Sequence, residues 1–347
     1  MYSVSVGVFA HNEEAAISNS IGSLLTQTLL VDPPRLLARL NVFCLANGCH
    51  DATAIRAGAL FNSAEKNLGQ NVELKVVEFP EGGKARTWNK FVHDLAPYSD
   101  YLIFMDGDIE LGLDRCLEIL VDALRASESA VITTDHPMKD LRSGRNPSAR
   151  ARLSQAASVL AAEEGATLCG QLYCAKGAFA QRVWMPDGLL VEDGFLRAFA
   201  VTDCFSSPVE KPQRILRVEG AYHWFIPYLS LPSLLAHEKR LMLGTAMNAV
   251  LFGTFWELSS ESVEVSRFVE EKYIDDPRWA LGLVHEKFSD TAWPVPIGLA
   301  LKPMILWREC TGRRKLSLFF PALVRTIVGL AVFLLATRAA KKSSFCW

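Results

Sequence analysis

Short apolar runs alternate with amphipathic segments along the first 140 residues of the chain. The runs lie at residues 4–9, 40–46, 72–79, 101–105 and 130–134 and are rich in Val, Ile, Leu and Phe, as is typical of strands. In the segments between them, apolar residues recur every three or four positions, which predicts helices. Strands that alternate with helices predict an α/β fold with a Rossmann-like, doubly wound, mainly parallel sheet.

Beyond about residue 230 the pattern changes, and no further strands are predicted. Residues 233–258 form a long stretch of helical character, and residues 297–307 form an apolar run that contains Pro303. We therefore expect an α/β domain over residues 1–235, followed by a helical C-terminal region over residues 236–347 with much apolar surface.

Residues 316–338 are an apolar segment flanked by Arg and Lys clusters. A membrane-spanning helix needs about 20 predominantly apolar residues, which this segment nearly supplies. Arg325 near its centre would cost roughly 2.5–3.5 kcal/mol in hydrocarbon. The basic flanks suit an anionic leaflet, so we expect a membrane surface as a partner, at the cytoplasmic face of the inner or plasma membrane. A spanning helix, a helix lying in the interface and a helix buried against the domain remain alternatives.

Charge and cysteine usage exclude several classes of protein. The 347 residues include 36 Lys and Arg and 38 Asp and Glu. The chain therefore has no excess of positive charge that would indicate a nucleic-acid partner. The eight cysteines include no C-x-x-C pair, which argues against a zinc ribbon or a thioredoxin-like site. The N-terminus lacks a basic and apolar leader. Together these features predict reduced thiols and a cytoplasmic location.

Two carboxylates, Asp106 and Asp108, follow the fourth predicted strand. Side chains at i and i+2 of an extended strand point to the same side, so one divalent ion can lie near both. Carboxylate oxygens suit Mg²⁺ or Mn²⁺, and such an ion would relieve the repulsion between the two acids. Gly107 between them would let a phosphate or a sugar approach the backbone. An isolated D-x-D is a weak signal, because Asp also stabilises turns at strand ends.

Further charged residues fall on predicted helices. Glu192 and Asp193 open a helix, where the helix dipole alone also favours acids. Lys84 follows two glycines at another helix start; this place suits an anionic ligand, although a solvated surface lysine is the plainer interpretation. His237 and Arg240 lie one helical turn apart, so both side chains could face a diphosphate.

Six segments occur in the order and spacing of a known family. They are SVGVFAHNEEAAI (5–17), LANGCHDATA (45–54), GGKARTWNK (82–90), MDGDIEL (105–111), CGQLYCAKGAF (169–179) and VEDGFLRA (191–198). On these segments the chain resembles the family 2 glycosyltransferases with the GT-A fold, over about residues 2–245. The resemblance implies that residues 1–235 form a catalytic domain that binds a nucleotide-sugar donor, with Mg²⁺ or Mn²⁺ as cofactor. It also implies a strand within residues 169–179.

The resemblance implies a role for each residue of the site. The donor-binding residues would be Asn12, Glu13, Asp51, Lys84, Asp106, His237 and Arg240, the metal ligands Asp108 and Asp106, and the catalytic residues Asp193 and Glu192. Glu13 and Asp51 would hold a uridine-type nucleoside, and Asp106 would contact its base or ribose. Asp108 would bind the metal and the diphosphate, and Asp193 would act as the catalytic base.

The family inverts the anomeric centre in a single displacement. The metal and Arg240 would offset the charge of the departing nucleoside diphosphate, and one carboxylate would take the proton of the acceptor hydroxyl. We expect transfer from a UDP-linked sugar to a lipid-linked or glycan acceptor. Processive members carry Q/R-x-x-R-W, whereas this chain has His237 first and Leu241 in place of Trp, so a non-processive enzyme is expected. His223 is a rival to His237, although a lone His among aromatic residues is more typical of a core.

Two alternatives remain beside this interpretation. A sugar-phosphate nucleotidyltransferase shares the fold, but the Gly-rich loop with Arg and Lys that it would carry after the first strand is replaced by AHNEEAAI at residues 10–17. A catalytically inactive, membrane-associated protein with the GT-A fold is the other alternative, since fold alone does not prove activity. The acids that the resemblance implies are all present in the chain, which favours the transferase.

Overall fold

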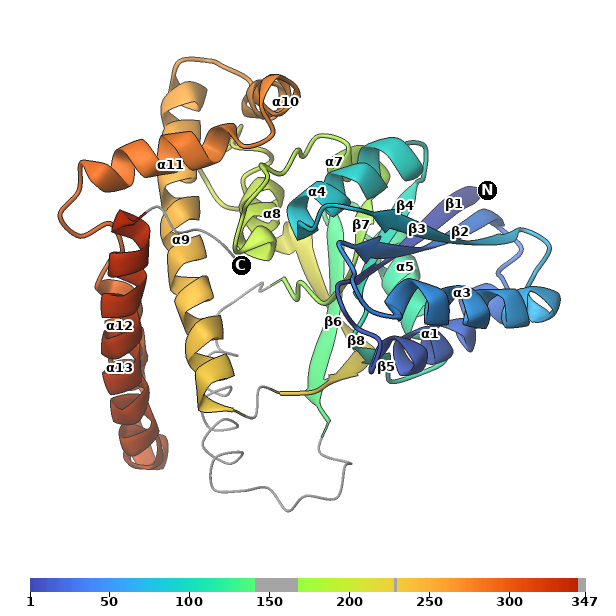
Figure 1. The fold of residues 1–347 in the computed structure, drawn as a ribbon, viewed down its shortest axis with the longest axis horizontal. Coiled ribbons are helices and arrows are strands. Elements are labelled where there is room, and N and C mark those ends of the chain that lie inside the picture. Colours follow the sequence, from blue (N-terminus) through green and yellow to red (C-terminus); the bar gives the residue numbers. More distant parts are fainter. Residues whose placement is uncertain (141–167, 228–229, 343–347) are drawn as a thin grey trace.

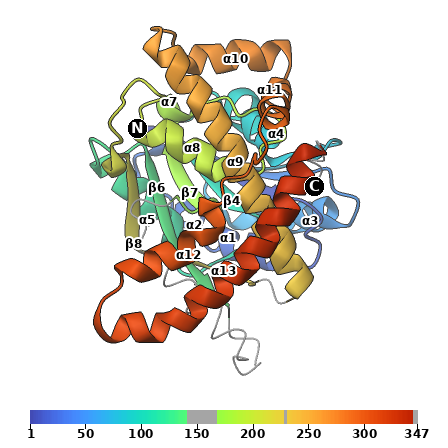
Figure 2. The same cartoon turned by 90° about the vertical axis from the view of Figure 1, so that its left-hand side faces the viewer.

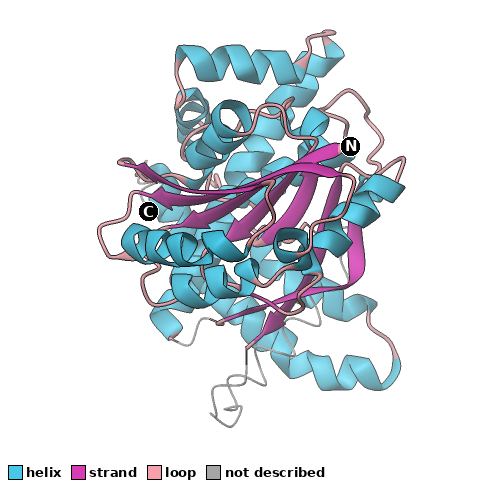
Figure 3. Ribbon diagram, turned by 90° about the vertical axis from the view of Figure 1, so that its right-hand side faces the viewer, coloured by secondary structure: helices cyan, strands magenta, loops and turns pink. Residues whose placement is uncertain are grey.

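The protein is built on one twisted sheet with helices on both faces (Figures 1 and 3). The computed structural model describes residues 1–140, 168–227 and 230–342. Its strands are β1 (Tyr2–Ala10), β2 (Leu37–Asn47), β3 (Val72–Phe79), β4 (Tyr101–Asp106), β5 (Glu110–Leu111), β6 (Ile132–Lys139), β7 (Leu172–Lys176) and β8 (Ile215–Phe225).

Within the described residues, the sheet has eight strands in the order β3-β2-β1-β4-β7-β6-β8-β5. Parallel pairs join β1 to β2 and β4, β2 to β3, and β6 to β8. β7 runs antiparallel to β4 and β6, and β5 runs antiparallel to β8. The predicted α/β sheet is therefore confirmed, with one antiparallel strand, β7, inside it and another, β5, at its edge.

The apolar runs predicted five strands, and the resemblance predicted β7. The sequence pattern missed β5 and β8. β5 has only two residues, too few to give a periodic signal. β8 mixes Arg217, Glu219 and Gly220 with its apolar residues, so neither a continuous apolar run nor a strict alternation marks it.

Helices enclose a separate core on each face of the sheet. They are α1 (Ile17–Leu25), α2 (Thr28–Val31), α3 (Thr53–Ala64), α4 (Lys84–Asn89), α5 (Cys116–Ala126), α7 (Gly177–Ala180), α8 (Glu192–Val201), α9 (Leu231–Ser260), α10 (Val265–Asp275), α11 (Trp279–Ser289), α12 (Gly298–Glu309) and α13 (Gly312–Lys341), with short 3₁₀ turns at Glu65–Asn67 and Pro212–Arg214 and a π-helical turn at Lys90–Leu95. On one face, α1, α3 and α5 bury residues such as Ile21, Phe61 and Leu120. On the other face, α4 and α8 share a core with the C-terminal helices, which includes Trp88 and Phe199.

The helical C-terminal region begins with α9, which lies beside α8 and contributes Met247 and Phe255 to the shared core. Helix α13 packs along α9 and α12 (Figure 2). By length and composition alone, α9 and α13 are each long and apolar enough to cross a membrane. The predicted helical and apolar character of this region is confirmed, whereas the domain boundary between residues 235 and 236, which falls inside α9, stays a prediction.

The carboxyl ends of β1, β2 and β4 lie side by side at one edge of the sheet, because these strands are parallel neighbours. Their registers align Ala10 with Ala46, and Phe9 with Asp106. The loops that follow these strands therefore gather at one edge, which is where ligands of open α/β sheets bind.

Candidate active site

The loops after β1 and β2 are tied together at this edge. Asn12 has a positive φ of 56°, and its Oδ1 accepts a hydrogen bond from the His50 amide at 2.8 Å. Oδ2 of Asp51 accepts one from the Glu14 amide at 3.1 Å. The structure thus brings together Asn12, Glu13 and Asp51, three of the predicted donor-binding residues, on two adjacent loops.

Asp51 also organises the start of α3. Its Oδ1 accepts hydrogen bonds from the Thr53 hydroxyl at 2.5 Å and from the Thr53 amide at 3.0 Å. The Thr53 hydroxyl is the main cause that lowers the pKa of Asp51 below its ordinary value. The same hydroxyl accepts a hydrogen bond from the Glu13 amide at 2.8 Å. Asp51 therefore has a structural function of its own, typical of Asp at a helix start.

Glycines allow the loop after β2 to touch the start of α4. Gly48 has a φ of 61°, and a Cβ at this position would lie 2.7 Å from the Gly82 nitrogen. Next to it, the Gly83 amide donates a hydrogen bond to Asn47 Oδ1 at 2.9 Å. The close approach excludes a side chain at residue 48 and places Lys84, the first residue of α4, above the edge of the sheet.

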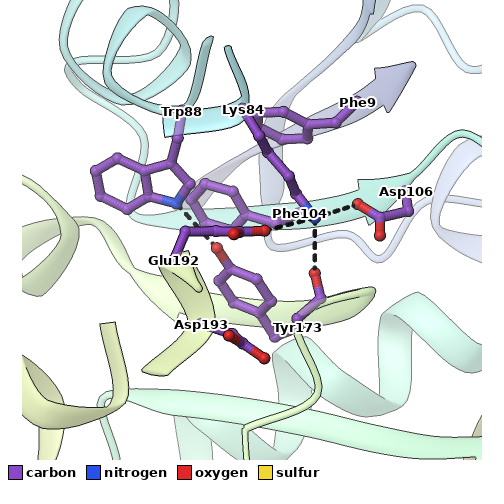
Figure 4. Close-up of a pocket in the computed structure, with 9 residues that line it drawn as sticks. Phe9, Lys84, Trp88, Phe104, Asp106, Tyr173, Glu192 and Asp193 are labelled. Carbon is purple, nitrogen blue, oxygen red and sulfur yellow. Dashed lines mark hydrogen bonds and ion pairs between the residues drawn. The ribbon is translucent and has the colours of Figure 1, made fainter. Parts of the chain in front are cut away.

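Lys84 lies between the two acidic motifs (Figure 4). Its Nζ is 2.7 Å from Asp106 Oδ1, 3.1 Å from Glu192 Oε1 and 3.5 Å from the Gly170 carbonyl oxygen. The Lys84, Asp106 and Glu192 side chains are only 26, 21 and 12 % exposed. Burial favours the neutral amine, but the two carboxylates outweigh it and raise the pKa of Lys84 well above its ordinary value. The predicted donor-binding lysine thus joins two predicted site carboxylates.

Three carboxylates, those of Asp51, Asp106 and Asp108, lie within electrostatic reach of Glu13. Burial, together with the charges of Asp108, Asp106 and Asp51, raises the pKa of Glu13 to about 7. Burial also raises the pKa of Asp106 to about 6, although Lys84 acts in the opposite direction. Clustered acids disfavour their charged forms unless a cation lies among them. Their oxygens are the ligands that a hard divalent ion prefers.

The turn that carries Asp108 corrects one premise of the sequence analysis. β4 ends at Asp106, and Gly107 and Asp108 form a turn instead of continuing the extended strand. Asp106 contacts Lys84, whereas Asp108 is exposed. Gly107 is buried, and a Cβ there would lie 2.8 Å from the Ala10 Cβ. The small size of Gly107 is therefore required by its packing against β1.

Glu192 and Asp193 occupy the first turn of α8, as predicted. Burial would raise the pKa of Glu192, but the charge of Lys84 holds it below its ordinary value. Asp193 lines the same cavity as Asp106 (Figure 4), and its Oδ1 accepts a hydrogen bond from the Gly194 amide at 2.8 Å. Burial and the charge of Glu192 raise the pKa of Asp193. The two neighbouring acids are thus pushed in opposite directions.

Aromatic side chains form one wall of the cavity, and sequence reasoning did not place them in the site. Phe9, Trp88, Phe104 and Tyr173 line it. The Trp88 and Phe104 rings stack at 5.4 Å, and those of Phe104 and Tyr173 at 4.5 Å. Trp88 Nε1 donates a hydrogen bond to the Tyr173 hydroxyl at 2.9 Å. They come from β1, α4, β4 and β7, so only the folded chain brings them together.

Helix α9 passes close to the start of α8. Arg240 Nη1 donates a hydrogen bond to the Leu190 carbonyl at 3.3 Å, and its charge is one of those that oppose the effect of burial on the pKa of Glu192. His237 lies one turn earlier, and burial, followed by the charge of Arg240, lowers its pKa. The structure therefore brings Arg240 within electrostatic reach of the acids on α8, with His237 beside it.

A buried pair joins β6 and β8 next to the site. His223 Nδ1 and Asp135 Oδ2 are 2.6 Å apart, and both side chains are fully buried. His223 Nε2 is 3.3 Å from Gln171 Oε1, and the Gln171 carbonyl accepts a hydrogen bond from the Asp106 amide at 2.9 Å. The Cys169 sulfur completes a group of three metal-binding residue types within 4.8 Å of one another, with Asp135 and His223. The expectation that His223 is a core residue is confirmed.

Comparison with known families now identifies the architecture. A model described as glycosyl transferase family 2 matches residues 5–177. The chain belongs to glycosyl transferase family 2. The matched part of this glycosyltransferase contains the loops of Asn12, Asp51 and Asp108 together with Lys84, whereas α8 and α9 lie beyond it.

One solved structure shares the fold of this glycosyltransferase over nearly its whole length. Mannosyltransferase PcManGT from Pyrobaculum calidifontis, solved with GDP-Man and Mn²⁺, superposes with a TM-score of 0.56 at 15% identity, over 98% of this chain and 86% of that one. Glucosyl-3-phosphoglycerate synthase from Mycobacterium tuberculosis, solved with Mn²⁺, UDP and glucosyl-3-phosphoglycerate, gives a TM-score of 0.47 at 21% identity, over 71% and 80% of the two chains. No protein in a search of curated sequences matches this chain. The family and the GT-A fold predicted from the sequence are confirmed.

Proposed function

We propose that this chain is a metal-dependent, inverting and non-processive glycosyltransferase. It moves one sugar from a nucleotide-sugar donor to a hydroxyl of a lipid-linked or glycan acceptor at the cytoplasmic face of the inner or plasma membrane. The observation that supports this best is the cavity where Lys84 joins Asp106 of one acidic motif to Glu192 of the other, with Asp193 beside them. Family membership gives the reaction class, and the lysine and carboxylates of this cavity support the proposed assignment of the site.

Asp106 and Asp108 are the proposed ligands of Mg²⁺ or Mn²⁺. The fit rests on the carboxylates themselves, because Glu13 is held at a pKa of about 7 by burial and by its acidic neighbours, a cost that a divalent cation would relieve. Exposed Asp108 is free to turn towards such an ion and a diphosphate, since it forms no hydrogen bond or ion pair with the described residues. When bound, the ion would neutralise the charge that develops on the departing diphosphate.

Lys84 and Arg240 are the proposed cationic groups of the donor site. Lys84 spans the two acidic motifs with distances of 2.7 and 3.1 Å, so it sits where a donor phosphate would meet the edge of the sheet. Positive charge from Arg240 reaches the start of α8. Fixed cations of this kind stabilise a leaving diphosphate without reorganisation during the reaction. Asn12, Glu13 and Asp51, on the adjoining loops, are the proposed nucleoside contacts. His237 is proposed to face the donor diphosphate together with Arg240.

Asp193 is the proposed general base. Burial and the charge of Glu192 raise its pKa above the ordinary value, which makes a carboxylate a better proton acceptor. Glu192 is held ionised by Lys84 and therefore orients that lysine. The acceptor oxygen would form its bond to the anomeric carbon while the bond to the diphosphate oxygen breaks, and its proton would pass to Asp193. Attack from the face opposite the leaving group inverts the anomeric centre.

The donor class is the first property to test. UDP is proposed from the resemblance of the nucleoside loops, whereas the structural neighbour PcManGT was solved with GDP-Man. Thermal unfolding of detergent-solubilised protein should be followed with UDP, GDP, CDP and dTDP, each with and without Mn²⁺. A ligand at 100 times its Kd stabilises by about 2.7 kcal/mol, so we expect an upward shift with UDP that requires the metal.

The controls separate the site from unspecific binding. Asp108→Asn should lose the metal-dependent shift, and Asp114→Asn, which changes an exposed acid outside the cavity, should keep it. A wild-type protein that no nucleotide stabilises with metal would contradict the proposal. Release of pyrophosphate from a nucleoside triphosphate and a sugar phosphate would indicate a nucleotidyltransferase instead.

A further inference from the structure

Helix α13 carries an outward stripe of large apolar residues. Leu316, Phe320, Leu323, Ile327, Leu330 and Leu334 recur at alternating spacings of four and three, so they lie on one side of the helix. Leu316, Phe320, Ile327 and Leu334 are 83, 66, 59 and 50 % exposed. Leu330 is also exposed, and Leu323 is half-buried. Isolated exposed apolar residues are ordinary, but a row of six with five exposed side chains along one helix indicates a contact surface.

The inward side of α13 has the opposite construction. Ala322, Thr326, Gly329, Phe333, Ala336 and Ala340 follow the same alternation and, Phe333 excepted, are small. A Cβ at Gly329 would lie 3.1 Å from the Ala300 carbonyl oxygen of α12, and the Phe333 ring stacks on Trp293 at 5.6 Å. Small residues let α13 pack closely on its neighbours. The large apolar residues of the stripe are therefore directed away from the protein.

We propose that the stripe from Leu316 to Leu334 lies on an anionic lipid bilayer, with α13 parallel to the membrane plane instead of crossing it. This inference deepens the proposed membrane location of the transferase and rests on that part of the proposed function. A helix of this kind buries its apolar side among the acyl chains and headgroups.

Contacts along the whole length of α13 exclude a span. The first half of the helix packs on α12 through Leu318 and Ala322, and the second half packs into the core shared with α9 and α11. The 27 residues Lys315–Lys341 of α13 are about 40 Å long, so a crossing would carry α11, which packs on α13, into the hydrocarbon. Exposed charges such as Glu286 and Lys287 on α11 would then be desolvated.

Charge favours a lipid surface over a second copy of the chain. Residues 298–342 contain nine Lys and Arg but one Glu, whereas the residues before them contain 27 basic and 37 acidic residues. Exposed Arg338, Lys341 and Lys342 follow the stripe directly. Cations at the edge of an apolar surface bind the headgroups of anionic lipids. A paired coiled coil would instead require charges of both signs beside its seam, and α13 contains no acidic residue.

Arg325 does not interrupt this surface. It lies two residues before Ile327 on the helix, which places it on the opposite side from the stripe. Its charge, after burial, contributes to lowering the pKa of Lys139 at the end of β6, so it faces the protein. The cost of an arginine in hydrocarbon, which argued against insertion when only the sequence was considered, therefore does not apply to the stripe.

Flotation with vesicles tests the surface. Full-length protein should float with vesicles of phosphatidylcholine and phosphatidylglycerol, and less with phosphatidylcholine alone or at high salt. Ile327→Glu with Leu334→Glu should lower the partition coefficient by roughly 100-fold, from the apolar area withdrawn from lipid. The matched control is Ile55→Glu with Ile274→Glu, two exposed isoleucines on α3 and α10, which should bind as the wild type does.

Depth measurements test the orientation. A fluorophore attached to a single cysteine introduced at Leu316, Ile327 or Leu334 should be quenched equally by lipids that carry a shallow quencher, with the unsubstituted protein as control for native thiols. A deep position for residue 327 between shallow ends would overturn the parallel arrangement. Equal flotation of the stripe and control variants, or dimers in solution that the stripe substitutions dissociate, would overturn the lipid contact. The metal-dependent thermal shift with nucleotides, measured on the same variants, separates these failures from failure of the proposed donor site.

Discussion

The edge of the sheet and the outer side of α13 are both energetically unfavourable in the protein alone, the first because of clustered charge and the second because of exposed apolar area. At the edge, Glu13, Asp106 and Asp108 place more negative charge together than Lys84 balances, and burial together with these charges raises the pKa of Glu13 to about 7. On α13, side chains such as Phe320 and Ile327 expose apolar surface to water. A continuous exposed apolar surface is unfavourable for a folded chain in solution. We propose that a component from outside the chain completes each region, a cation with its donor in one case and lipid in the other.

The largest effect on activity should come from removing the carboxylate of Asp108, whose proposed role is to bind the metal. Asp108→Asn should lower kcat/KM by about 10⁴-fold, since a metal ion contributes several kcal/mol to stabilising the leaving group. The melting temperature without ligands should not fall, because Asp108 is exposed and loss of its charge relieves the repulsion on Glu13. Steady-state kinetics with the identified donor measures the loss. Turnover equal to that of Asp114→Asn would show that Asp108 does not serve the reaction.

Asp193→Asn should lower kcat by about 10³-fold, because a general base acts in the transition state. Donor binding, followed by the metal-dependent thermal shift, should be retained. The pH profile is the second readout, since loss of the base removes the rise of activity that accompanies ionisation of Asp193. A collapse of donor binding in this variant would assign Asp193 to the donor site.

The buried pair next to the site should affect stability more than chemistry. His223→Phe leaves the fully buried Asp135 without its partner, and the free energy of unfolding should fall by about 3–5 kcal/mol. The double variant Asp135→Leu with His223→Phe should recover part of this loss, because no unpaired charge remains. Urea unfolding of both variants checks the difference. Equal stability of the single and double variants would mean that the pair is not electrostatically coupled.

The acid cluster predicts how stability without metal depends on pH. The folded-state pKa of Glu13 is raised to about 7 and that of Asp106 to about 6, so between about pH 4 and 7 the folded protein binds more protons here than the unfolded chain does. These groups should therefore make the protein less stable as pH rises through this range. Thermal unfolding across the range should show a smaller decline with Mn²⁺ present.

Glu13→Gln is the matched variant for this effect, and Glu65→Gln, at an exposed position, is its control. The decline should weaken in the first and persist in the second. A decline that Mn²⁺ leaves unchanged would place the metal away from these carboxylates and would contradict a metal site at this edge of the sheet.

The smallest effect on folding should come from the stripe. Ile327→Glu with Leu334→Glu should change the free energy of unfolding in solution by about 0.5 kcal/mol or less, as is usual for exposed positions. Chemical denaturation without lipid measures it. A large destabilisation would mean that the outward residues belong to the core and do not form a surface for contact with lipid.

Much of the sheet could be predicted because its signals are local. The apolar runs of β1 to β4 marked strands whose carboxyl ends had to meet, and this placed Asp51 and Asp106 on neighbouring loops. The bridge of Lys84 to both acidic motifs could not be predicted, since it joins residues 22 and 108 positions apart in the sequence. The same limit hid the stacking of Trp88 and Tyr173 on Phe104, because sequence periodicity shows these residues only as apolar.

The prediction that Asp108 continues the extended strand was wrong for a different reason. Alternation along a strand holds only as far as the strand extends, and β4 ends at Asp106. The end is set by packing, because the buried Gly107 hydrogen bonds to the Phe9 carbonyl at 2.8 Å and touches Ala10. Nothing in the residues from 101 to 108 alone records that contact with β1.

Helix α9 has a consequence for how the enzyme searches for its acceptor. It packs against α8, which carries Asp193, and also against α13. With α13 lying on a bilayer, one rigid helix would hold the catalytic cavity at a constant height and tilt above the lipid. An acceptor anchored in the same leaflet would then be met by diffusion in two dimensions, so the rate would follow the number of acceptors per unit of membrane area, and diluting the suspension would leave it unchanged.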